Sequence, residues 1–359
     1  MYSFTSLKIK DIIKETPNAV SLVFDIPSDL QSDFRFLPGQ FLTLQADINN
    51  QKVRRSYSIS SVPNSKSLQV SIKKIPNGIF STYATDSLKP LDVLEVGFPE
   101  GRFTLVPNNE NEKNYLAFVA GSGITPVLSM LTSVMVLEPK STFTLFYGNK
   151  TQMDTLFYNK LQELQKQYSN RLSINYIFSK EQVAGSLFGR IDANKVNDAL
   201  KNQYKDITFH DIFLCGPVAM QKIVKETLLD FGCIPEQIHQ ELFFDPDAAI
   251  PVSLPEQPQS IQQEKISQSV VKVLVDDEEF ELEVNSESTL LDQILAKDID
   301  VPYSCQGGVC CSCICRVTEG KATMPANKML TDKELQEGLV LSCQAYADDL
   351  KITLDFDDA

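Results

Sequence analysis

The stretch YSCQGGVCCSC at residues 303–313 decides the fold of the last quarter of this 359-residue chain. Three of its cysteines, Cys305, Cys310 and Cys313, follow the spacing C-x4-C-x2-C, and Cys343 comes after a further 29 residues. Gly307 and Gly308 inside the loop let the backbone wrap closely round a bound inorganic group, because glycine adopts twisted conformations that other residues avoid. The pattern therefore predicts four thiolates that converge on a metal site.

This spacing is typical of the ligands of a 2Fe–2S cluster. A structural zinc site is one alternative, but zinc sites usually show two C-x2-C or Cys/His pairs, and only one such pair is present. Disulfides are a second alternative, which the absence of an export signal at the start of the chain disfavours. We expect Cys311 and Cys315 to point away from the metal, although the sequence leaves open a slip from Cys310 to Cys311.

The region around these cysteines is strongly acidic. Residues 269–359 carry 19 Asp and Glu against 7 Lys and Arg, a net charge of −12, whereas residues 1–268 carry 28 against 26, a net charge of −2. A chain with a net charge of −14 and no basic cluster lacks the positively charged surface that binds nucleic acid or an anionic membrane. The last quarter therefore differs in character from the rest and is predicted to be a separate domain.

Two further features of composition exclude function classes. Only two histidines occur, His210 and His239, which disfavours histidine-rich metal sites, including the two-histidine Rieske cluster. No apolar run approaches the ~20 residues that a membrane-spanning helix needs. The first residues also lack the apolar core of a signal peptide. We therefore expect a cytoplasmic protein without a membrane span.

Residues 1–110 show short apolar or alternating runs separated by turn signals such as Pro38-Gly39 and Asn77-Gly78. Short strands at this spacing predict an antiparallel β-barrel. The expected strands lie at 21–26, 41–45, 55–60, 68–73 and 93–98.

Residues 111–244 change to strands that alternate with helices, which predicts βαβ units and an α/β domain with a parallel sheet. The expected strands lie at 115–120, 142–147, 173–178 and 211–215, and the expected helices at 127–137, 156–168 and 218–231. Residues 245–268, with four Pro and five Gln, are predicted to be an exposed linker. Residues 269–359 form the predicted α+β domain, which opens with a hairpin (270–275 and 279–284) and a helix (290–296).

Two motifs in the first 268 residues have side chains or backbone that could bind a cofactor. Arg55-Ser56-Tyr57-Ser58 lies on a predicted strand, where alternation places Arg55 and Tyr57 on one face. An arginine can pair with a pyrophosphate, a tyrosine can stack on a flavin ring, and a serine hydroxyl can bond a ring nitrogen. By itself this tetrapeptide is more often structural, so its meaning depends on the motifs around it.

The second motif, Gly121-Ser122-Gly123-Ile124-Thr125-Pro126, follows an apolar strand and opens a helix. Glycines there let the backbone approach a phosphate at a helix N-terminus, although Pro126 stands where the G-x-G-x-x-G fingerprint has its third glycine. The next strand ends in Tyr147-Gly148-Asn149-Lys150, without the acidic residue that holds the ribose of NAD. Lys150 could meet a 2′-phosphate, which favours NADPH, with NADH as the alternative.

Together with Pro38-Gly39-Gln40-Phe41, Gly78-Ile79-Phe80-Ser81-Thr82 and Gly101-Arg102-Phe103, these motifs resemble the ferredoxin–NADP reductase superfamily, and residues 269–359 resemble a plant-type ferredoxin domain. One departure is Leu91, at a turn where the family usually has glycine. The resemblance implies FAD rather than FMN, bound by Arg55, Ser56, Tyr57, Ser58, Gly78, Ser81 and Thr82. It implies a coenzyme site at Gly121, Gly123, Thr125, Pro126, Cys215, Gly216 and Pro217.

The resemblance also places Ser58, Cys215 and Glu241 at the site of hydride transfer. Judged without the family, Cys215 would be a buried core cysteine, and Met220 is expected to be core packing. Ser58 and Cys215 would lie on the two sides of the contact between flavin and nicotinamide.

The order of barrel, nicotinamide domain, linker and ferredoxin resembles the reductase components of bacterial multicomponent oxygenases. This implies electron transfer from NAD(P)H through FAD and the 2Fe–2S cluster to a terminal oxygenase or hydroxylase component, docked at the acidic ferredoxin domain. The resemblance favours an epoxidase as that oxygenase. The alternatives are another acceptor (a steroid hydroxylase, or an alkane or fatty-acyl oxygenase), a stand-alone NAD(P)H diaphorase, a redox-responsive regulatory module or a zinc-binding module.

Overall fold

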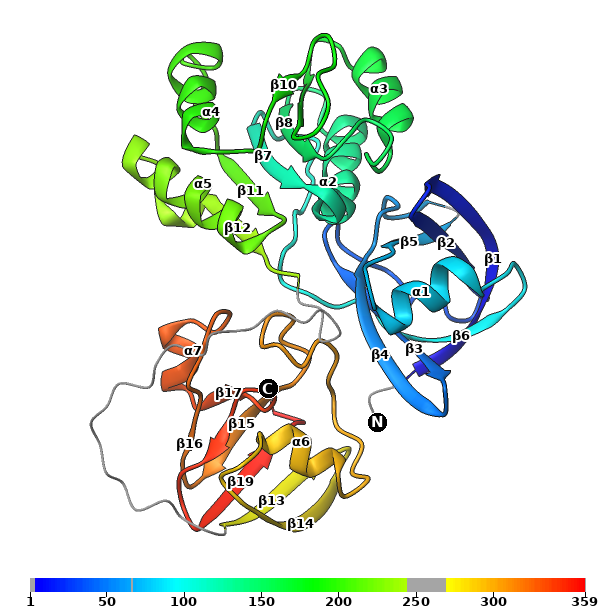
Figure 1. Ribbon diagram of the computed structural model, residues 1–359. Helices are drawn as coiled ribbons and strands as arrows, with labels where there is room; N and C mark the ends of the chain where they lie inside the picture. Colours follow the sequence, from blue (N-terminus) through cyan, green and yellow to red (C-terminus); the bar gives the residue numbers. More distant parts are fainter. Residues whose placement is uncertain (1–3, 66, 244–268, 359) are drawn as a thin grey trace. The chain divides into compact units, whose positions relative to one another are not determined.

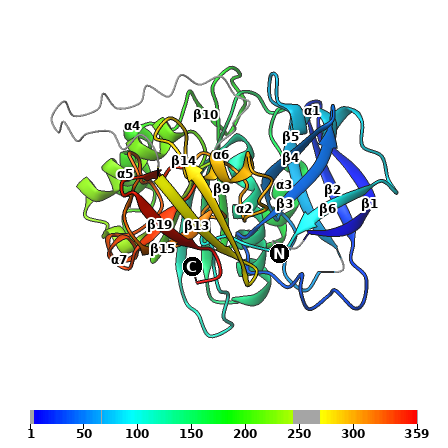
Figure 2. The same ribbon diagram turned by 90° about the horizontal axis from the view of Figure 1, so that it is seen from below.

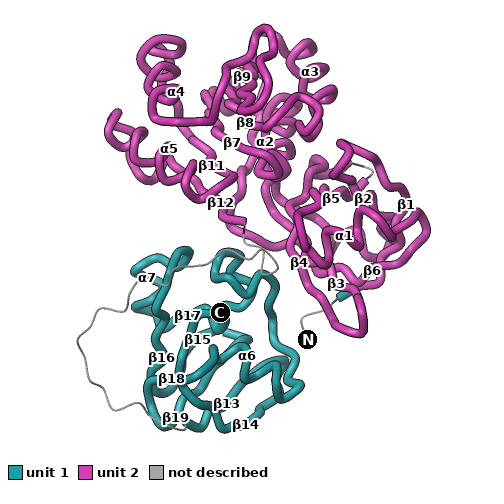
Figure 3. Tube along the Cα trace, in the orientation of Figure 1, with its two compact units in different colours: residues 1–4, 244–359 teal, residues 5–243 magenta. Residues whose placement is uncertain are grey.

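The computed structural model describes residues 4–65, 67–243 and 269–358. The chain divides into two compact units, residues 5–243 and residues 244–359 with residues 1–4 (Figure 3). The linker predicted at 245–268 lies outside the described residues, and the domain boundaries predicted at 110 and 244 stay predictions. No helix in the described ranges is long and apolar enough to cross a membrane. The cytoplasmic location also stays a prediction.

The first part of the larger unit is the predicted antiparallel barrel, with sheet order β4-β3-β6-β1-β2-β5 (Figure 1). A bridge between Ile59 and Val70 joins the two ends of the sheet and closes it. Leu22, Leu44 and Phe80 are among the buried residues that fill the interior. The elements are β1 (Phe4–Thr16), β2 (Ala19–Asp25), β3 (Phe41–Ile48), β4 (Gln51–Ser58), β5 (Leu68–Lys73), α1 (Ile79–Asp86) and β6 (Val93–Gly97).

Strand β1 was missed by the sequence analysis. Its pairing with β2 shifts register between Ile9 and Asp11 and again between Lys14 and Thr16. Each shift breaks the period-2 alternation by which a half-buried strand is recognised. The barrel prediction is confirmed, with this strand added.

The second part of the larger unit is a six-stranded parallel sheet, as predicted, with strand order β10-β9-β8-β7-β11-β12. Its strands are β7 (Asn114–Ala120), β8 (Thr142–Asn149), β9 (Leu172–Phe178), β10 (Leu187–Phe188), β11 (Asp211–Cys215) and β12 (Ile238–Glu241). Its helices are α2 (Ile124–Leu137), α3 (Tyr158–Gln167), α4 (Ala193–Asp198) and α5 (Val218–Phe231).

Alternate residues of the central strand β7 face two different cores. Ala117 and Val119 pack with α2 and α3, whereas Leu116 and Phe118 pack with α4 and α5. Helices therefore cover both faces of the sheet (Figures 1 and 2). This layering leaves the carboxyl ends of the strands as the edge where an open α/β sheet binds its ligands.

The smaller unit holds a five-stranded mixed sheet of order β14-β13-β19-β15-β17 and a two-stranded sheet of β16 and β18. Its core is apolar and includes Cys315, which is fully buried, so this spare cysteine is a packing residue. The strands are β13 (Ser269–Val275), β14 (Glu278–Val284), β15 (Ile314–Glu319), β16 (Ala322–Thr323), β17 (Leu339–Leu341), β18 (Tyr346–Ala347) and β19 (Lys351–Asp355). The helices are α6 (Leu290–Leu295) and α7 (Asp332–Gln336), and the α+β prediction is confirmed.

Candidate functional site

Three side chains from distant parts of the sequence meet in the larger unit. The pairing of β11 and β12 makes Cys215 and Glu241 register partners at the carboxyl ends of both strands. Ser58, the last residue of β4, donates a hydrogen bond from Oγ to Glu241 Oε2 at 3.5 Å. The Cys215 thiol reaches the same oxygen at 3.9 Å. The structure thus brings together the three residues predicted for the catalytic site.

This cluster is closed to solvent, with exposed fractions of 4% for Ser58, 0% for Cys215 and 9% for Glu241. Burial raises the pKa of Glu241 to about 8, and the hydrogen bonds from Ser58 and Cys215 offset only part of that rise. Burial, followed by the neighbouring Glu241 carboxyl, holds the pKa of the Cys215 thiol well above its usual range. At neutral pH both groups are mainly protonated, so the cluster carries little charge.

A glutamine that the sequence analysis missed holds the backbone of this cluster. The Gln221 side chain is buried, and its Nε2 donates to the carbonyl of Glu241 at 2.7 Å and to that of Gly216 at 2.9 Å. The β11–β12 ladder ends at Glu241, so this amide supplies the next link between the two chain segments. The only signal in the sequence is a glutamine in the first turn of the helix that Cys-Gly-Pro opens.

The turn after β7 lies directly against the same place. A Cβ on Gly123 would lie 2.3 Å from the Cys215 carbonyl oxygen, and Gly216 has φ +148, so both positions need glycine. Gly121 has φ +58, and its carbonyl accepts a hydrogen bond from Tyr147 Oη at 3.1 Å. The predicted coenzyme turn and the Cys215 turn are therefore adjacent.

The remaining residues of the coenzyme turn are buried at the start of α2. Thr125 Oγ1 donates to the Ser122 carbonyl at 2.9 Å, which stabilises the turn from inside. Pro126 is buried in the first turn, where its missing N–H costs no helical hydrogen bond. Pro217 immediately precedes α5. These residues shape the backbone of the turns more than they present side chains to a ligand.

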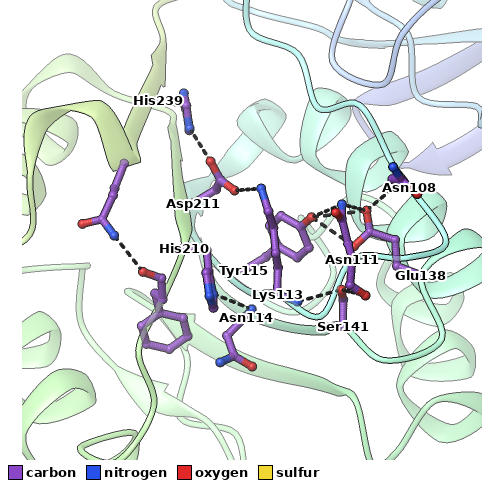
Figure 4. A network of polar contacts seen from close by, with 12 residues as sticks. Asn108, Asn111, Lys113, Asn114, Tyr115, Glu138, Ser141, His210, Asp211 and His239 are labelled. Carbon is purple, nitrogen blue, oxygen red and sulfur yellow. Dashed lines mark hydrogen bonds and ion pairs between the residues drawn. The ribbon is translucent and has the colours of Figure 1, made fainter.

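The opposite edge of the parallel sheet is fixed by a polar network (Figure 4). Asp211, at the start of β11, accepts from Lys113 at 3.1 Å and pairs with His239 Nε2 at 3.0 Å. Buried Glu138 accepts a hydrogen bond from Tyr115 Oη at 3.0 Å. Since His239 lies on β12 two residues before Glu241, the network anchors the strand that ends in Glu241.

The predicted flavin residues lie on β4 and at the start of α1. Three of them, Arg55, Ser56 and Tyr57, are partly exposed. The ring centroids of Tyr57 and of Phe80 on α1 lie 5.6 Å apart, so the two rings pack together. Ser81 is buried, and its hydroxyl accepts from the Ile75 N–H at 3.3 Å.

The start of α1 is tightly packed. A Cβ on Gly78 would lie 2.4 Å from Ser81 Oγ, and the Thr82 N–H donates to the Gly78 carbonyl at 3.1 Å. Ser81 and Gly78 therefore shape the helix start, where backbone N–H groups are the groups available to a phosphate.

The four predicted metal ligands fall into two close pairs in the smaller unit. The Cys310 thiol lowers the pKa of Cys305, and the Cys343 thiol raises that of Cys313, so each pair of thiols lies close together. The two pairs adjoin, since Gln344, next to Cys343, donates to the carbonyl of Gln306, next to Cys305, at 3.3 Å. In the described part of the chain no three His, Cys, Asp or Glu side chains are placed to hold one metal ion. Four thiols gathered in this way would be able to hold a two-iron core.

Backbone N–H groups point at these sulfurs. Those of Gly307 and Val309 reach Cys305 Sγ at 3.3 and 3.5 Å, and the Cys305 N–H reaches Cys310 Sγ at 3.5 Å. The Cys310 thiol, aided by the N–H groups of Val309 and Gly307, lowers the pKa of Cys305 even though burial acts to raise it. Such donors stabilise anionic sulfur, so the loop fits an iron–sulfur cluster. Cys311, the alternative ligand, occupies the left-handed region with φ +61.

Comparisons with known families agree with this division. The oxidoreductase FAD-binding domain matches residues 6–105, the oxidoreductase NAD-binding domain residues 118–226, and the 2Fe-2S iron-sulfur cluster binding domain residues 273–348. The resemblance read from the motifs is thus confirmed for all three parts, and FAD and a 2Fe–2S cluster are supported as cofactors. A nicotinamide coenzyme is supported without distinction between NADPH and NADH.

Two similar proteins span nearly the whole chain. One component of the 1,2-phenylacetyl-CoA epoxidase of Escherichia coli (strain K12) is 36% identical over 359 residues, covering 99% of both chains. The ferredoxin reductase component of 3-ketosteroid-9-alpha-monooxygenase of Rhodococcus rhodochrous is 32% identical and covers 96% of this chain and 95% of its own length. Phthalate dioxygenase reductase shares the fold, with a TM-score of 0.59, 20% identity and 98% coverage of each chain.

Proposed function

Since the chain belongs to the family of oxygenase reductase components that includes this 1,2-phenylacetyl-CoA epoxidase component, we propose that it supplies electrons from NAD(P)H to the terminal component of such an oxygenase. The chain is an NAD(P)H-dependent flavin and iron–sulfur oxidoreductase. The proposed acceptor is a phenylacetyl-CoA epoxidase. A steroid hydroxylase, or an alkane or fatty-acyl oxygenase, is the alternative acceptor.

The observation that carries this proposal is the buried cluster of Ser58, Cys215 and Glu241. One residue comes from the barrel and two from the parallel sheet, so ligands of the two parts would meet at this cluster. When bound, FAD accepts a hydride from the coenzyme and releases electrons singly to the 2Fe–2S cluster. The chain's own task is to orient the two rings and to exclude water.

Each residue of the cluster has a proposed role. The Ser58 hydroxyl would face the flavin and the Cys215 thiol the nicotinamide, while the Glu241 carboxyl holds both side chains in place. Because Glu241 is mainly protonated at neutral pH, it places no fixed negative charge beside a ring that receives a hydride. A neutral cluster that is closed to solvent favours direct hydride transfer over reaction with water.

We propose that the flavin is held by the β4 motif and the start of α1. Arg55 carries the permanent charge that pairs with a pyrophosphate, and Tyr57 presents a partly exposed ring for stacking. The first-turn N–H groups of α1 would bind a phosphate oxygen. The residues are Arg55, Ser56, Tyr57, Ser58, Gly78, Ser81 and Thr82.

We propose NADPH as the coenzyme, held by Gly121, Gly123, Thr125, Pro126, Cys215, Gly216 and Pro217. Lys150 follows β8 directly and is exposed. The Lys180 N–H donates to the Lys150 carbonyl at 2.9 Å. The two lysines therefore lie side by side, just after the carboxyl ends of the neighbouring strands β8 and β9. In NAD-binding proteins an Asp or Glu side chain at this place binds the ribose. Two lysines here instead support recognition of a 2′-phosphate.

We propose that Cys305, Cys310, Cys313 and Cys343 ligate the 2Fe–2S cluster and that the acidic ferredoxin domain docks the oxygenase. Glu279, Glu281 and Glu283 alternate along β14, an edge strand, and all three are exposed. An acidic row of this kind suits a basic patch on a partner. Such steering weakens as salt screens the charges.

The first test is the visible spectrum of the purified protein. Flavin peaks with a broad brown shoulder are expected, and both should bleach when NADPH is added without oxygen. A colourless protein would reject the proposal, whereas flavin without the shoulder would leave zinc or a lost cluster. Electron transfer to the purified oxygenase should slow as ionic strength rises, and a rate independent of salt would reject docking through the acidic domain.

A further inference from the structure

The residue after the fourth ligand carries a side-chain donor to the metal site. Gln344 Nε2 lies 2.7 Å from the Cys343 carbonyl, 3.3 Å from the Gln306 carbonyl and 3.6 Å from Cys343 Sγ. A side-chain amide has two hydrogens. The Cys343 carbonyl, the Gln306 carbonyl and the sulfur therefore share the two N–H groups of this amide.

The fold leaves this amide little freedom. Gly308 has φ +68, and a Cβ at that position would lie 2.7 Å from Gln344 Cγ, so the glutamine stem lies across the cysteine loop. The Gln344 backbone N–H is bonded to the Leu341 carbonyl at 2.8 Å. Gln344 is partly buried and Cys343 is 3% exposed, so water competes weakly for the sulfur.

We propose that the Gln344 amide raises the reduction potential of the cluster by donating a hydrogen bond to Cys343 Sγ. The inference rests on the proposed ligand set. Reduction adds one negative charge to the cluster and its sulfurs, so an N–H dipole aimed at a ligand sulfur stabilises the reduced form more than the oxidised form. The donors to Cys305 are backbone groups, whereas this donor belongs to a side chain and can be exchanged by substitution.

The test uses the full chain with FAD and cluster bound. Gln344→Met keeps the length of the side chain and removes both N–H donors, and Gln344→Glu replaces the donor by an anionic acceptor. Gln336→Met is the matched control, because Gln336 is exposed at the end of α7 in the same domain. The cluster potential is measured by redox titration followed by electron paramagnetic resonance, with the flavin potential in the same sample as an internal reference.

In Gln344→Met the ratio of reduced to oxidised cluster at a fixed potential should fall roughly tenfold, the weight of one hydrogen bond to a charged group, which is about 59 mV for a one-electron couple. Gln344→Glu should lower the ratio further, and Gln336→Met should leave it unchanged. The flavin potential should be the same in all samples.

Three results would overturn the inference. An unchanged cluster potential in Gln344→Met would show that the sulfur is not tuned by this amide. Loss of the cluster from both Gln344 variants, with normal iron content in Gln336→Met, would show that the amide holds the loop instead. A wild-type protein without a cluster signal would reject the proposed ligand set, which is a separate outcome visible before any variant is made.

Discussion

Ser58 at the end of β4 donates a hydrogen bond to Glu241 at the end of β12, across 183 residues of sequence. The bond joins the barrel to the outermost strand of the parallel sheet, and the Cys215 thiol completes the contact at the same carboxyl oxygen. Because the Glu241 carboxyl and the Cys215 thiol are buried in contact, each affects the pKa of the other. The predictions below begin from this contact.

Glu241→Gln should flatten the dependence of stability on pH. The folded-state pKa of Glu241 is raised to about 8, so its contribution to stability is complete below about pH 4.5 and is lost as pH rises towards 8. The loss amounts to at most about 1.4 kcal/mol per pH unit. The midpoint of thermal unfolding of the full chain should therefore fall less between pH 5 and 8 in the variant than in the wild type. Equal slopes would show that the carboxyl is not held protonated.

Gln221→Leu should destabilise the larger unit by about 2 kcal/mol, because the buried Glu241 carbonyl and the partly buried Gly216 carbonyl lose their donor. Flavin reduction by NADPH should also slow, since the Gly216 turn and the end of β12 are no longer joined. Stopped-flow absorbance and thermal unfolding report the two effects. Gln240→Leu is the control. It removes only the 3.4 Å hydrogen bond to Gln221 Oε1 and leaves both bonds from Gln221 Nε2 to the backbone carbonyls in place. If both variants behave alike, the bridging role of Gln221 is wrong.

Leu91→Gly should stabilise the barrel by about 1 kcal/mol. Leu91 has φ +80 and is 72% exposed, so it bears the steric cost of the left-handed region without gaining burial. Its backbone bonds, including Leu91 N–H to the Ile9 carbonyl at 2.8 Å, do not depend on the side chain. The midpoint of thermal unfolding should rise in Leu91→Gly and fall in Leu91→Val, where the β-branched side chain increases the strain. A rise in Leu91→Val would contradict this reading of the turn.

Lys150→Ala and Lys180→Ala should each lower kcat/KM for NADPH about tenfold, as expected for the loss of a charge-assisted contact to phosphate. The value for NADH should change little, because NADH carries no 2′-phosphate. Steady-state reduction of ferricyanide with each coenzyme measures the ratio. Parallel losses with NADPH and NADH would place the lysines outside the phosphate site.

Cys343→Ser should abolish the cluster's brown shoulder and its paramagnetic signal, because one iron loses a thiolate. Cys311→Ser should retain both, since Cys310 is the neighbour that pairs with Cys305. Iron and sulfide analysis of the purified variants provides the measurement. Loss of the cluster in Cys311→Ser would revive the slipped ligand set that the sequence left open.

Much of this architecture follows from local pattern. Strand β11 and helix α5 have the bounds expected from sequence, since a short apolar run, a Gly-Pro turn and an amphipathic stretch each act over a few residues. Met220 is core packing, as expected. Strand β1 was missed because its register shifts interrupt the alternation, and α4 was missed because six residues carry too little helical period.

The sequence by itself determined the kinds of chemistry, because metal ligation and close approach to phosphate require particular residues at fixed local spacing, as in Cys305-x4-Cys310-x2-Cys313 and Gly121-x-Gly123. Only the tertiary structure decided which distant groups meet. Glu241 meets Ser58 because two sheets place their strand ends together. Gln221 reaches the Glu241 carbonyl and Gln344 the Gln306 carbonyl, and no periodicity of the sequence links these pairs. A hydrogen bond needs its partner within a few ångströms, and folding alone supplies that distance between residues far apart in the chain.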